Sequence, residues 1–370
     1  MPERRILSID VFRGLTVAGM VLVNNPGSWG AVYAPLRHAD WHGWTPTDLI
    51  FPFFLFIVGV AIPLALGRRL REDRGGGPIV PRILRRAVII FALGLVLHAV
   101  SNFDAATIRL PGVLQRIAVC YLVAALLFVF TGWRTQAAVA GAALLGYWAL
   151  LTLVPVPGFG AGDLGKEGNL AAWLDRTVLG PHIWRPGRVY DPEGILSTLP
   201  AIATTLFGVL TGHFVKAAPS TRAVVKGLAG SGAVGIVIGL AWAQVFPINK
   251  ALWTSSYAVF TAGAGLLVLA ACFWMIEVKG WTWWTGPFVV FGVNALAVFF
   301  LSTLVAILLT RVHVGDGAGH TRVLQAVLYE RYFAPWVRPA TASLGWAIAN
   351  VLLWLAVMGG LYRKGIRVSV

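Results

Sequence analysis

The sequence predicts an all-α polytopic membrane protein, a bundle of about ten transmembrane helices in a single domain over residues 1–370. Hydrophobic residues make up 58% of the chain, and charged residues make up only 12%. Soluble domains carry about twice that share of charged residues. Apolar runs long enough to cross a bilayer recur along the whole chain. Because such a chain cannot cover itself with polar surface, the lipid bilayer must serve as its solvent.

Apolar runs of about 20 residues account for the predicted spans, since that length crosses the hydrocarbon core of a bilayer. They cover residues 6–24, 48–66, 83–101, 112–130, 136–154, 195–213, 227–245, 253–275, 285–309 and 341–361. Between the first two runs, the loop 25–47 carries an unusual cluster of polar residues. The loops 155–194 and 310–340 are long and mix aromatic, basic and carboxylate side chains with Gly and Pro. Such loops are typical of a cap over a membrane cavity rather than of a bare anchor.

The basic residues indicate how the chain is oriented in the membrane. The 30 Lys and Arg residues outnumber the 15 Asp and Glu residues, which gives a formal net charge of +15. More than half of the basic residues lie in or beside one alternating set of loops, which includes both termini. The positive-inside rule therefore predicts a multi-pass protein of the bacterial inner membrane with both termini in the cytoplasm, and it makes the other loops periplasmic. Lys and Arg residues that are spread over the loops on one side of a membrane do not form a phosphate-binding face. We therefore predict no nucleic-acid partner.

The stretch LRHADWHGWTPTDLIFP brings two His and two Asp residues to the mouth of the second predicted helix. Asp48 either caps this helix, because an acid in the first turn suits the free N–H groups, or orients His38 through a hydrogen bond. His38, Asp40 and His42 have the chemistry of metal ligands but lack a second set of ligands, so we predict no metal site. Trp41, in the same cluster, is a candidate contact for the substrate.

Charged side chains inside spans are costly, and they mark either a buried pair or a functional cavity. Asp10 and Arg13 are three residues apart and share a helix face, so they either form an ion pair or leave Arg13 near an anionic cofactor. Their charges, and the lack of a cleavage pattern after the apolar run, predict a retained first helix rather than a signal peptide. Arg116, which follows Gln115 near the periplasmic start of the fourth span, either snorkels to the interface or reaches a group in the cavity.

Further polar residues gather at the periplasmic ends of the spans. Asp191 and Glu193 immediately precede the sixth span, where one acid caps the helix and the other is free for a sugar hydroxyl or an ammonium group. Lys250 lies between Asn249 and Trp253 in FPINKALW, as either an interface anchor or a part of the site.

Three asparagines complete the set of candidates. Asn24 and Asn25 end the first span in NNPG, which is either an ordinary helix stop or a part of the site. Asn294 lies well inside the ninth span, where an amide either bonds a neighbouring helix or serves the site.

Six segments resemble, in the same order, the transmembrane acyltransferases of the heparan-α-glucosaminide N-acetyltransferase family. They are SIDVFRGLTVAGMVLVNN, RHADWHGWTPTDLIFPFFLFIVGVAI, IRLPGVLQRIAVCY, YDPEGILSTLPAIATTLFGVLTGH, FPINKALWTSSY and VKGWTWWTGPFVVFGVNALAVF. The resemblance implies an enzyme that uses cytoplasmic acetyl-CoA to acetylate the amine of a glucosamine-type sugar on the other side of the membrane. It implies His38 as the active-site histidine, Asp48 as the aspartate ten residues later, and Asn24 or Asn25 as the asparagine that ends the first helix. It also allows a homodimer.

Acyl transfer to an amino sugar gives each candidate residue a chemical role. His38 serves as general base or acetyl carrier, Asp48 holds its tautomer, and an asparagine donates to the oxyanion. The candidates that bind the co-substrate acetyl-CoA are Arg13, Arg85, Arg86, Gln115, Arg116 and Lys279. The candidates that bind the amino-sugar acceptor are Trp41, Asp191, Glu193, Asn249, Lys250, Trp253 and Asn294.

An amino-sugar transporter of the inner membrane is the competing hypothesis, because ten spans and a polar cavity fit it equally well. Transporters usually bind their substrate near the midplane of the bilayer. His38, Asp48 and the two asparagines after the first span are instead expected to cluster at one face of the membrane, which favours the enzyme.

Overall fold

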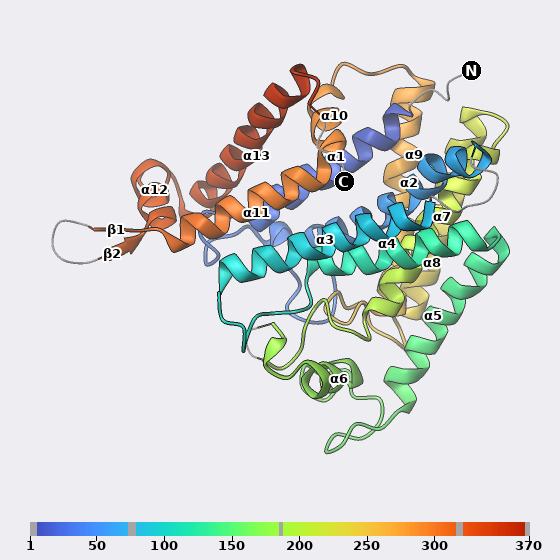
Figure 1. Cartoon of the computed structure of the whole chain (residues 1–370), viewed down its shortest axis with the longest axis horizontal. Helices are drawn as coiled ribbons and strands as arrows, with labels where there is room; N and C mark the ends of the chain where they lie inside the picture. Colours follow the sequence, from blue (N-terminus) through green and yellow to red (C-terminus); the bar gives the residue numbers. More distant parts are fainter. Residues whose placement is uncertain (1–5, 73–78, 185–187, 316–320, 367–370) are drawn as a thin grey trace.

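The structure is a computed structural model that describes residues 6–72, 79–184, 188–315 and 321–366. Helices dominate these ranges, and the strands in them form one antiparallel hairpin of β1 (His313–Gly315) and β2 (Thr321–Val323). The helices are α1 (Leu7–Asn24), α2 (Ile50–Glu72), α3 (Ile79–Ser101), α4 (Val113–Phe130), α5 (Trp133–Leu153), α6 (Leu170–Leu179), α7 (Thr198–Ala217), α8 (Thr221–Trp242), α9 (Ser255–Phe273), α10 (Gly286–Val293), α11 (Ala295–Arg311), α12 (Leu324–Tyr332) and α13 (Pro339–Arg363). The predicted all-α architecture is confirmed (Figure 1).

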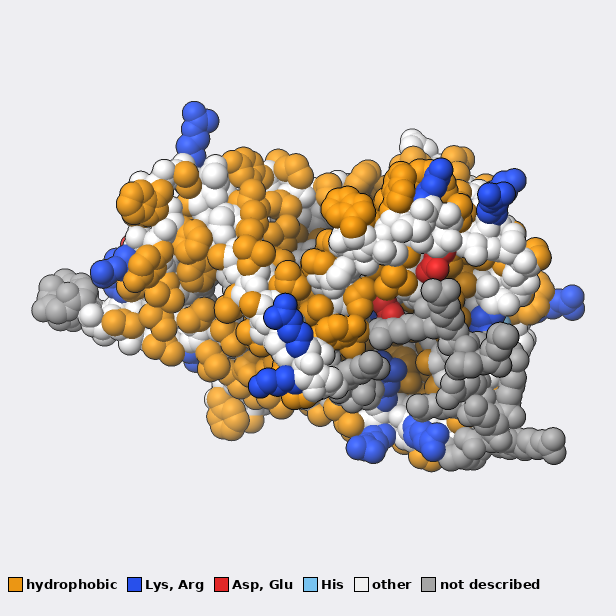
Figure 2. Space-filling view, turned by 90° about the horizontal axis from the view of Figure 1, so that it is seen from above, with side chains coloured by type: hydrophobic (Ala, Val, Ile, Leu, Met, Phe, Trp, Pro, Cys, Tyr) orange, Lys and Arg blue, Asp and Glu red, His pale blue; other side chains and the backbone are white. Residues whose placement is uncertain are grey.

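Nine helices in the described part of the chain are long and apolar enough to cross a membrane, and α10 with α11 would make a tenth, bent span. The prediction of about ten spans in a multi-pass membrane protein is therefore confirmed. Figure 2 shows many hydrophobic side chains on the face it presents, while Lys and Arg are scattered and acidic side chains are few. On α8 the exposed side chains include Val234, Val237 and Leu240. In a membrane protein such an apolar surface contacts lipid.

The ninth predicted span, 285–309, is not one continuous helix, which corrects the expectation from the sequence. It breaks at Asn294 into α10 and α11, whose axes differ by 83°. The guanidinium of Arg13 donates to the carbonyl oxygen of Gly292 at 3.3 Å. In a continuous helix that carbonyl would accept from the N–H group four residues later. Asn294 is therefore a buried residue at a helix break, and it lies in neither of the two cavities described below.

The two long loops are also more ordered than the sequence indicated. The loop 155–194 contains α6, whose N-cap Asn169 accepts a hydrogen bond from the N–H of Ala172 at 2.7 Å. The loop 310–340 contains the β1–β2 hairpin and α12, which extend from the end of α11 at one end of the long axis of the molecule (Figure 1). Both loops thus carry local structure that hydropathy alone does not reveal.

Successive spans alternate in direction, so their ends fall into two sets. We call the side where α1 ends the Asn24 side, and the side where α1 begins the Leu7 side. Helices α2, α4, α7 and α9 begin on the Asn24 side, and α6 lies there, between the end of α5 and the start of α7. The segments that surround α6 gather along the lower edge of Figure 1. The loop between α1 and α2 lies on this side too.

Helices α2 and α7 touch backbone to backbone at Gly59 and Gly208. A Cβ atom at Gly59 would lie 2.0 Å from the carbonyl oxygen of Thr205. Because backbone cannot yield unless the helices separate, we expect Gly59→Ala to lower the free energy of unfolding by about 1–3 kcal/mol, seen as a lower unfolding midpoint in detergent. Gly141→Ala on α5, where no heavy atom lies within 4 Å of the new Cβ, is the matched control. Equal midpoints for both variants would contradict this packing.

Candidate functional site

Two cavities lie along the same helices. The His38 cavity, of about 350 Å³, opens on the Asn24 side and is lined by His38, Asp48 and the first residues of α2 and α4. The Arg13 cavity, of about 310 Å³, lies nearer the Leu7 side and is lined by α1, α2, α3, α4 and the break before α11. On α2, Phe51 lines the first cavity and Phe54 the second. Three residues of helix advance about 4.5 Å, so roughly one helical turn separates the two cavities.

The His38 cavity begins with a hydrogen-bonded pair. Asp48 is 1% exposed and forms a capping box with Thr45 at a 3-10 turn before α2. Its Oδ2 accepts from the backbone N–H groups of Ala39 and Thr45, each at 3.0 Å. Its Oδ1 lies 2.6 Å from Nδ1 of His38. Both readings of Asp48 from the sequence therefore hold, since it caps the turn and also orients His38.

The contact between the carboxylate and the imidazole assigns the proton on the ring. A carboxylate 2.6 Å from Nδ1 requires that nitrogen to carry a hydrogen, so in the neutral ring the lone pair lies on Nε2. The side chain of His38 is 45% exposed, while that of Asp48 is 1% exposed. The buried carboxylate thus holds a ring that faces the cavity, an arrangement suited to a general base or a nucleophile.

Lys250 reaches the same pair from the segment between α8 and α9. Its Nζ lies 2.9 Å from Nδ1 of His38, 3.4 Å from Nε2 and 3.4 Å from Oδ1 of Asp48. Burial lowers the pKa of Lys250, while the carboxylates of Asp48 and Glu193 act in the opposite direction. Asn249 positions this segment, since its Oδ1 accepts from the N–H of Leu252 at 2.9 Å. The prediction that Lys250 belongs to the cavity agrees with this placement.

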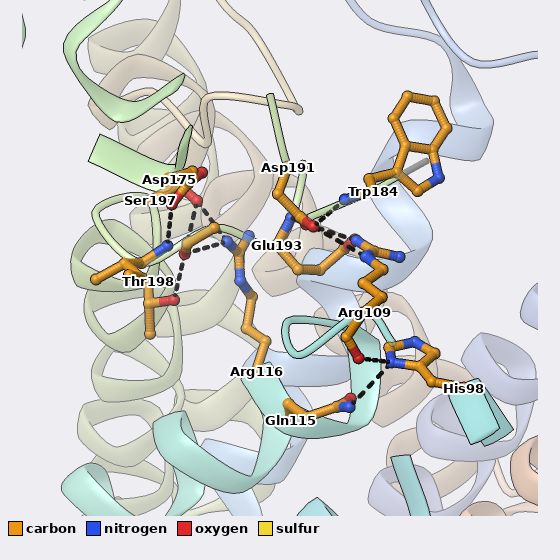
Figure 3. Close-up of polar contacts among 12 residues, drawn as sticks. His98, Arg109, Gln115, Arg116, Asp175, Trp184, Asp191, Glu193, Ser197 and Thr198 are labelled. Carbon is orange, nitrogen blue, oxygen red and sulfur yellow. Dashed lines mark hydrogen bonds and ion pairs between the residues drawn. The ribbon is translucent and has the colours of Figure 1, made fainter. Parts of the chain in front are cut away.

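A second charged group lines the cavity. Arg109, just before α4, donates through Nε and Nη2 to the two carboxylate oxygens of Asp191, at 2.9 and 2.5 Å. Its Nη2 also contacts Oε2 of Glu193 at 2.5 Å, as Figure 3 shows. Burial opposes the charge of Arg109, but Glu193 and Asp191 outweigh it and raise its pKa. Arg109 and Glu193 line the cavity, whereas Asp191 lies behind them and accepts from the N–H of Trp184 at 2.8 Å.

Sequence reasoning did not single out Arg109, although it lies in one of the segments that carry the family resemblance. In the sequence, a single Arg in a loop between two spans looks like the basic residues that set the orientation of a membrane protein. Its partners Asp191 and Glu193 are more than 80 positions away, so only the fold brings them together.

Aromatic side chains form another wall of the His38 cavity. Trp41, Trp184, Tyr190 and Trp253 all line it. The rings of Trp41 and Tyr190 are 4.9 Å apart between centroids, and those of Trp184 and Tyr190 are 5.7 Å apart. Nε1 of Trp41 donates to the carbonyl oxygen of Leu164 at 2.8 Å, which fixes that indole. Trp184 and Tyr190 were not among the predicted residues, and the only signal for them was the aromatic content of loop 155–194.

Arg116 and Gln115 do not line either cavity. The Nη2 group of Arg116 donates to the carbonyl oxygen of Gly194 at 3.1 Å and to Oγ of Ser197 (Figure 3). Its guanidinium also lies 5.2 Å from the ring centroid of Trp253. Gln115 approaches His98, with 3.4 Å between Nε2 and Nδ1. Arg116 therefore holds the segment after Glu193 against α4 on the Asn24 side.

Asp175 on α6 braces the same segment and predicts a pH-dependent stability. Burial raises its pKa to about 7, although its Oδ1 accepts from the N–H of Ile195 at 2.9 Å. Since its ordinary pKa is 3.8, the folded state holds a proton that the unfolded state releases, and this stabilisation is lost as the pH rises through about 7. We expect the thermal midpoint of the wild type to fall between about pH 4 and pH 8. In Asp175→Asn the thermal midpoint should fall less over this pH range, because the carboxyl group that titrates has been removed.

Thermal unfolding in detergent across this pH range measures the difference. Glu167→Gln, which removes an exposed carboxylate from the same loop, is the control and should keep the wild-type slope. A slope in Asp175→Asn equal to that of the wild type would rule out Asp175 as its source.

The Arg13 cavity contains two of the residues predicted to bind acetyl-CoA. Arg13 lines it while donating to Oδ1 of Asp10 at 3.3 Å and to the carbonyl oxygen of Gly292. Arg86 lines it with its guanidinium 4.8 Å from the ring centroid of Tyr121. Arg85 and Lys279 are exposed and do not line the cavity, and Lys279 stacks over Trp274 at 5.4 Å. The predicted cations are therefore divided among this cavity, the surface and, for Arg116, a buried contact outside both cavities.

The structure also separates the neighbouring asparagines. Asn24 is exposed and lines the His38 cavity. Asn25 is buried and donates to the carbonyl oxygen of Val21 at 2.7 Å, which completes the end of α1. Asn249 lies 3.3 Å from His42, with Nδ2 facing Nδ1, and does not line the cavity. In the part of the chain that the structure describes, no group of three or more His, Cys, Asp or Glu side chains is arranged to hold a metal ion.

Comparison with known proteins places this chain in a family. The family model described as "Heparan-alpha-glucosaminide N-acetyltransferase, catalytic" matches residues 5–240. Heparan-alpha-glucosaminide N-acetyltransferase of Mus musculus is 29% identical over 352 residues, which cover 80% of this chain and 53% of the mouse protein. That of Homo sapiens is 30% identical over 353 residues, covering 80% and 52%. The chain thus spans about half the length of these curated relatives. This chain belongs to the heparan-α-glucosaminide N-acetyltransferase catalytic family.

Proposed function

We propose that this protein is a transmembrane N-acetyltransferase that passes the acetyl group of cytoplasmic acetyl-CoA to the amine of a glucosamine-type sugar in the periplasm. The observation that carries the proposal is the His38–Asp48 pair facing a cavity of about 350 Å³, with the Arg13 cavity further along the same helices. The family of the chain, and the acetyltransferase name of its mouse and human relatives, support the same reaction.

His38 acts as the general base of the transfer. A protonated amine cannot attack a carbonyl, so the acceptor must lose protons before and during the reaction. The amine nitrogen attacks the thioester carbonyl carbon, a C–N bond forms, the C–S bond breaks, and its electron pair leaves with the sulfur as thiolate. Nε2 of His38 accepts a proton from the nitrogen, while Asp48 stabilises the imidazolium through Nδ1–H. The side-chain amide N–H of Asn24, in the same cavity, donates a hydrogen bond to the developing oxyanion.

The donor occupies the Arg13 cavity. Arg13 and Arg86 supply positive charge for the phosphate groups of acetyl-CoA, and the freed backbone at the start of α11 adds the positive end of a helix dipole. Broken helices that line cavities are a recurring solution for ion and substrate sites in membranes. The acyl arm crosses the single turn between Phe54 and Phe51 to reach His38. The positive-inside rule places the Leu7 side, with both termini, in the cytoplasm of a bacterial inner membrane.

The acceptor occupies the His38 cavity. Glu193, whose Oε2 is held by Arg109, is suited to bind the hydroxyl or ammonium groups of a sugar. Trp41, Trp184 and Tyr190 provide aromatic faces for the apolar face of a pyranose ring. A cavity of this volume, open to solvent, accommodates a single sugar unit or the end of a chain.

Acceptor-dependent release of CoA tests the proposal. The purified protein in detergent is given acetyl-CoA with and without glucosamine, and free thiol is measured over time. The proposal predicts thiol release only when the amine is present, together with N-acetylglucosamine as product. Folded protein that releases no CoA with any amino sugar, but takes up an amino sugar in vesicles without acetyl-CoA, would instead establish a transporter.

A further inference from the structure

Three titratable groups meet at one point of the His38 cavity, and each comes from a different part of the chain. His38 lies in the loop after α1, Asp48 begins α2, and Lys250 precedes α9. The polar atoms that the structure places near Nζ of Lys250 belong to the other two, at 2.9 and 3.4 Å on the ring and 3.4 Å on the carboxylate. Family membership and sequence reasoning assign no role to this contact beyond a place for Lys250 among the residues around the acceptor.

The positions of the hydrogens on His38 restrict which atoms can accept a hydrogen bond from Lys250. Nδ1 of His38 donates to Asp48, so it has no lone pair for an ammonium, although Nζ lies only 2.9 Å away. The ammonium of Lys250 can instead donate to Oδ1 of Asp48, 3.4 Å away, which leaves the lone pair on Nε2 for the acceptor. Asp48 and Lys250 then cancel in charge beside the imidazole. Without Lys250, the buried carboxylate would favour a charged imidazolium, which cannot act as a base.

The other charged and titratable groups around His38 do not offer Asp48 a second cation. They are Arg37, Asp40 and His42 on its own loop, Arg109 before α4, and Tyr190 and Glu193 before α7, and Nε of Arg37 donates to the carbonyl oxygen of Val32 at 2.7 Å. Arg109 is already held by both Asp191 and Glu193. Backbone contacts fix the position of Lys250, because the N–H of Gly43 donates to the carbonyl oxygen of Ile248 at 2.7 Å. This bond ties the segment of Lys250 to the loop of His38.

We propose that Lys250 is a positioning residue that neutralises Asp48 and thereby keeps the His38 imidazole uncharged and ready to accept a proton, rather than a contact for the acceptor sugar. The expected effect of Lys250 on the reaction rate rests on the acetyl transfer proposed above. Its expected effect on the charge of His38 is independent of that proposed function. Removing a cation beside an imidazole favours the protonated ring, so more His38 is charged at a given pH in a neutral variant. The structure thus assigns three members, His38, Asp48 and Lys250, to the proton-accepting unit.

The direct test measures the protonation of His38 without any substrate. Diethyl pyrocarbonate reacts with neutral imidazole, and mass spectrometry of the His38 peptide gives the extent of reaction across pH. In Lys250→Met and Lys250→Gln the midpoint of this curve is expected to rise by about one pH unit or more. Lys250→Arg keeps the charge and should keep the wild-type midpoint. Lys226→Met, on the exposed surface of α8, is the control, and the exposed His313 is an internal reference.

A kinetic measurement separates positioning from acceptor binding. Lys250→Met is expected to lose at least about tenfold in kcat at pH 6, to recover at pH 9, and to keep the KM for glucosamine. Lys250→Gln retains a hydrogen-bond donor for Asp48, so it provides a folded neutral variant if Met packs poorly. An unchanged midpoint of His38 modification in a folded neutral variant would overturn the proposal. A raised KM for glucosamine with an unchanged pH profile would overturn it too, and would make Lys250 a sugar contact. A wild type without transferase activity would refute the proposed function alone.

Discussion

His38→Ala is expected to lower acceptor-dependent CoA release by about 10²–10⁴-fold, the usual contribution of a positioned acid–base group. The imidazole faces the cavity and receives its orientation from the buried Asp48. Without it, the cavity loses the imidazole that the buried Asp48 holds beside the acceptor. The fall should appear in kcat, since the ring contributes to the transition state more than to binding.

Two further variants separate loss of the imidazole from indirect effects of the substitution. His313→Ala removes an exposed histidine from β1 and should leave CoA release at the wild-type rate. His38→Gln keeps most of the side-chain volume and should be as inactive as His38→Ala. Both His38 variants should keep a wild-type unfolding midpoint within a few degrees. Wild-type rates in either of them would refute the assignment of His38 as the base.

Arg109→Met should be among the most destabilising single changes in this protein. It leaves the carboxylate of Asp191, which is fully buried, and that of Glu193 without their cation. Breaking a buried ion pair by removal of one partner costs about 3–5 kcal/mol, because the remaining charge stays desolvated. The unpaired carboxylates then favour their protonated forms, so the difference from the wild type should shrink as the pH falls toward 4. Thermal unfolding in detergent at pH 7.5 and pH 4.5 measures both effects.

An exposed ion pair provides the matched control for Arg109→Met. Arg322 and Glu330 pair near the β1–β2 hairpin, with side chains 46% and 50% exposed. Exposed pairs contribute little to stability, so Arg322→Met should unfold near the wild-type midpoint at both pH values. Arg109→Lys keeps a charge but loses the two-point contact with Asp191, and it should lie between the wild type and Arg109→Met. If Arg109→Met unfolded at the same midpoint as Arg322→Met, the buried cluster would not contribute as the contacts indicate.

The number and approximate limits of the spans could be predicted from the sequence because hydropathy reports directly on the solvent that surrounds each helix. The exception is the ninth predicted span, which is broken. Residues 285–309 are mostly apolar, and one Asn inside a span is compatible with a continuous helix, so their composition does not mark the break at Asn294. At the break, Arg13, which lies more than 270 positions away, donates to the carbonyl oxygen of Gly292. A contact of this kind is visible only in the folded chain.

The candidate site was predictable where the chemistry is local. His38 and Asp48 are ten residues apart, and their pairing follows from one short loop. Arg109 and the side chains around it meet only after α3, α4 and the loop 155–194 are packed together, so no local pattern identified it. For Arg116 and Asn249, the sequence predicted contacts with acetyl-CoA and with the acceptor, whereas in the structure they contact the segments around Ser197 and Leu252. The sequence could not distinguish a residue that holds a loop in place from one that lines the cavity.

Transfer across a sealed membrane tests the central claim most directly. The protein is reconstituted in liposomes that contain glucosamine, acetyl-CoA is added outside only, and N-acetylglucosamine is measured inside. With part of the protein inserted so that the Leu7 side faces outward, the two-cavity arrangement predicts that acetylated sugar accumulates inside while CoA appears outside, and that His38→Ala abolishes both. Product that forms only when acetyl-CoA and glucosamine share the same compartment would contradict transfer between the Arg13 cavity and the His38 cavity.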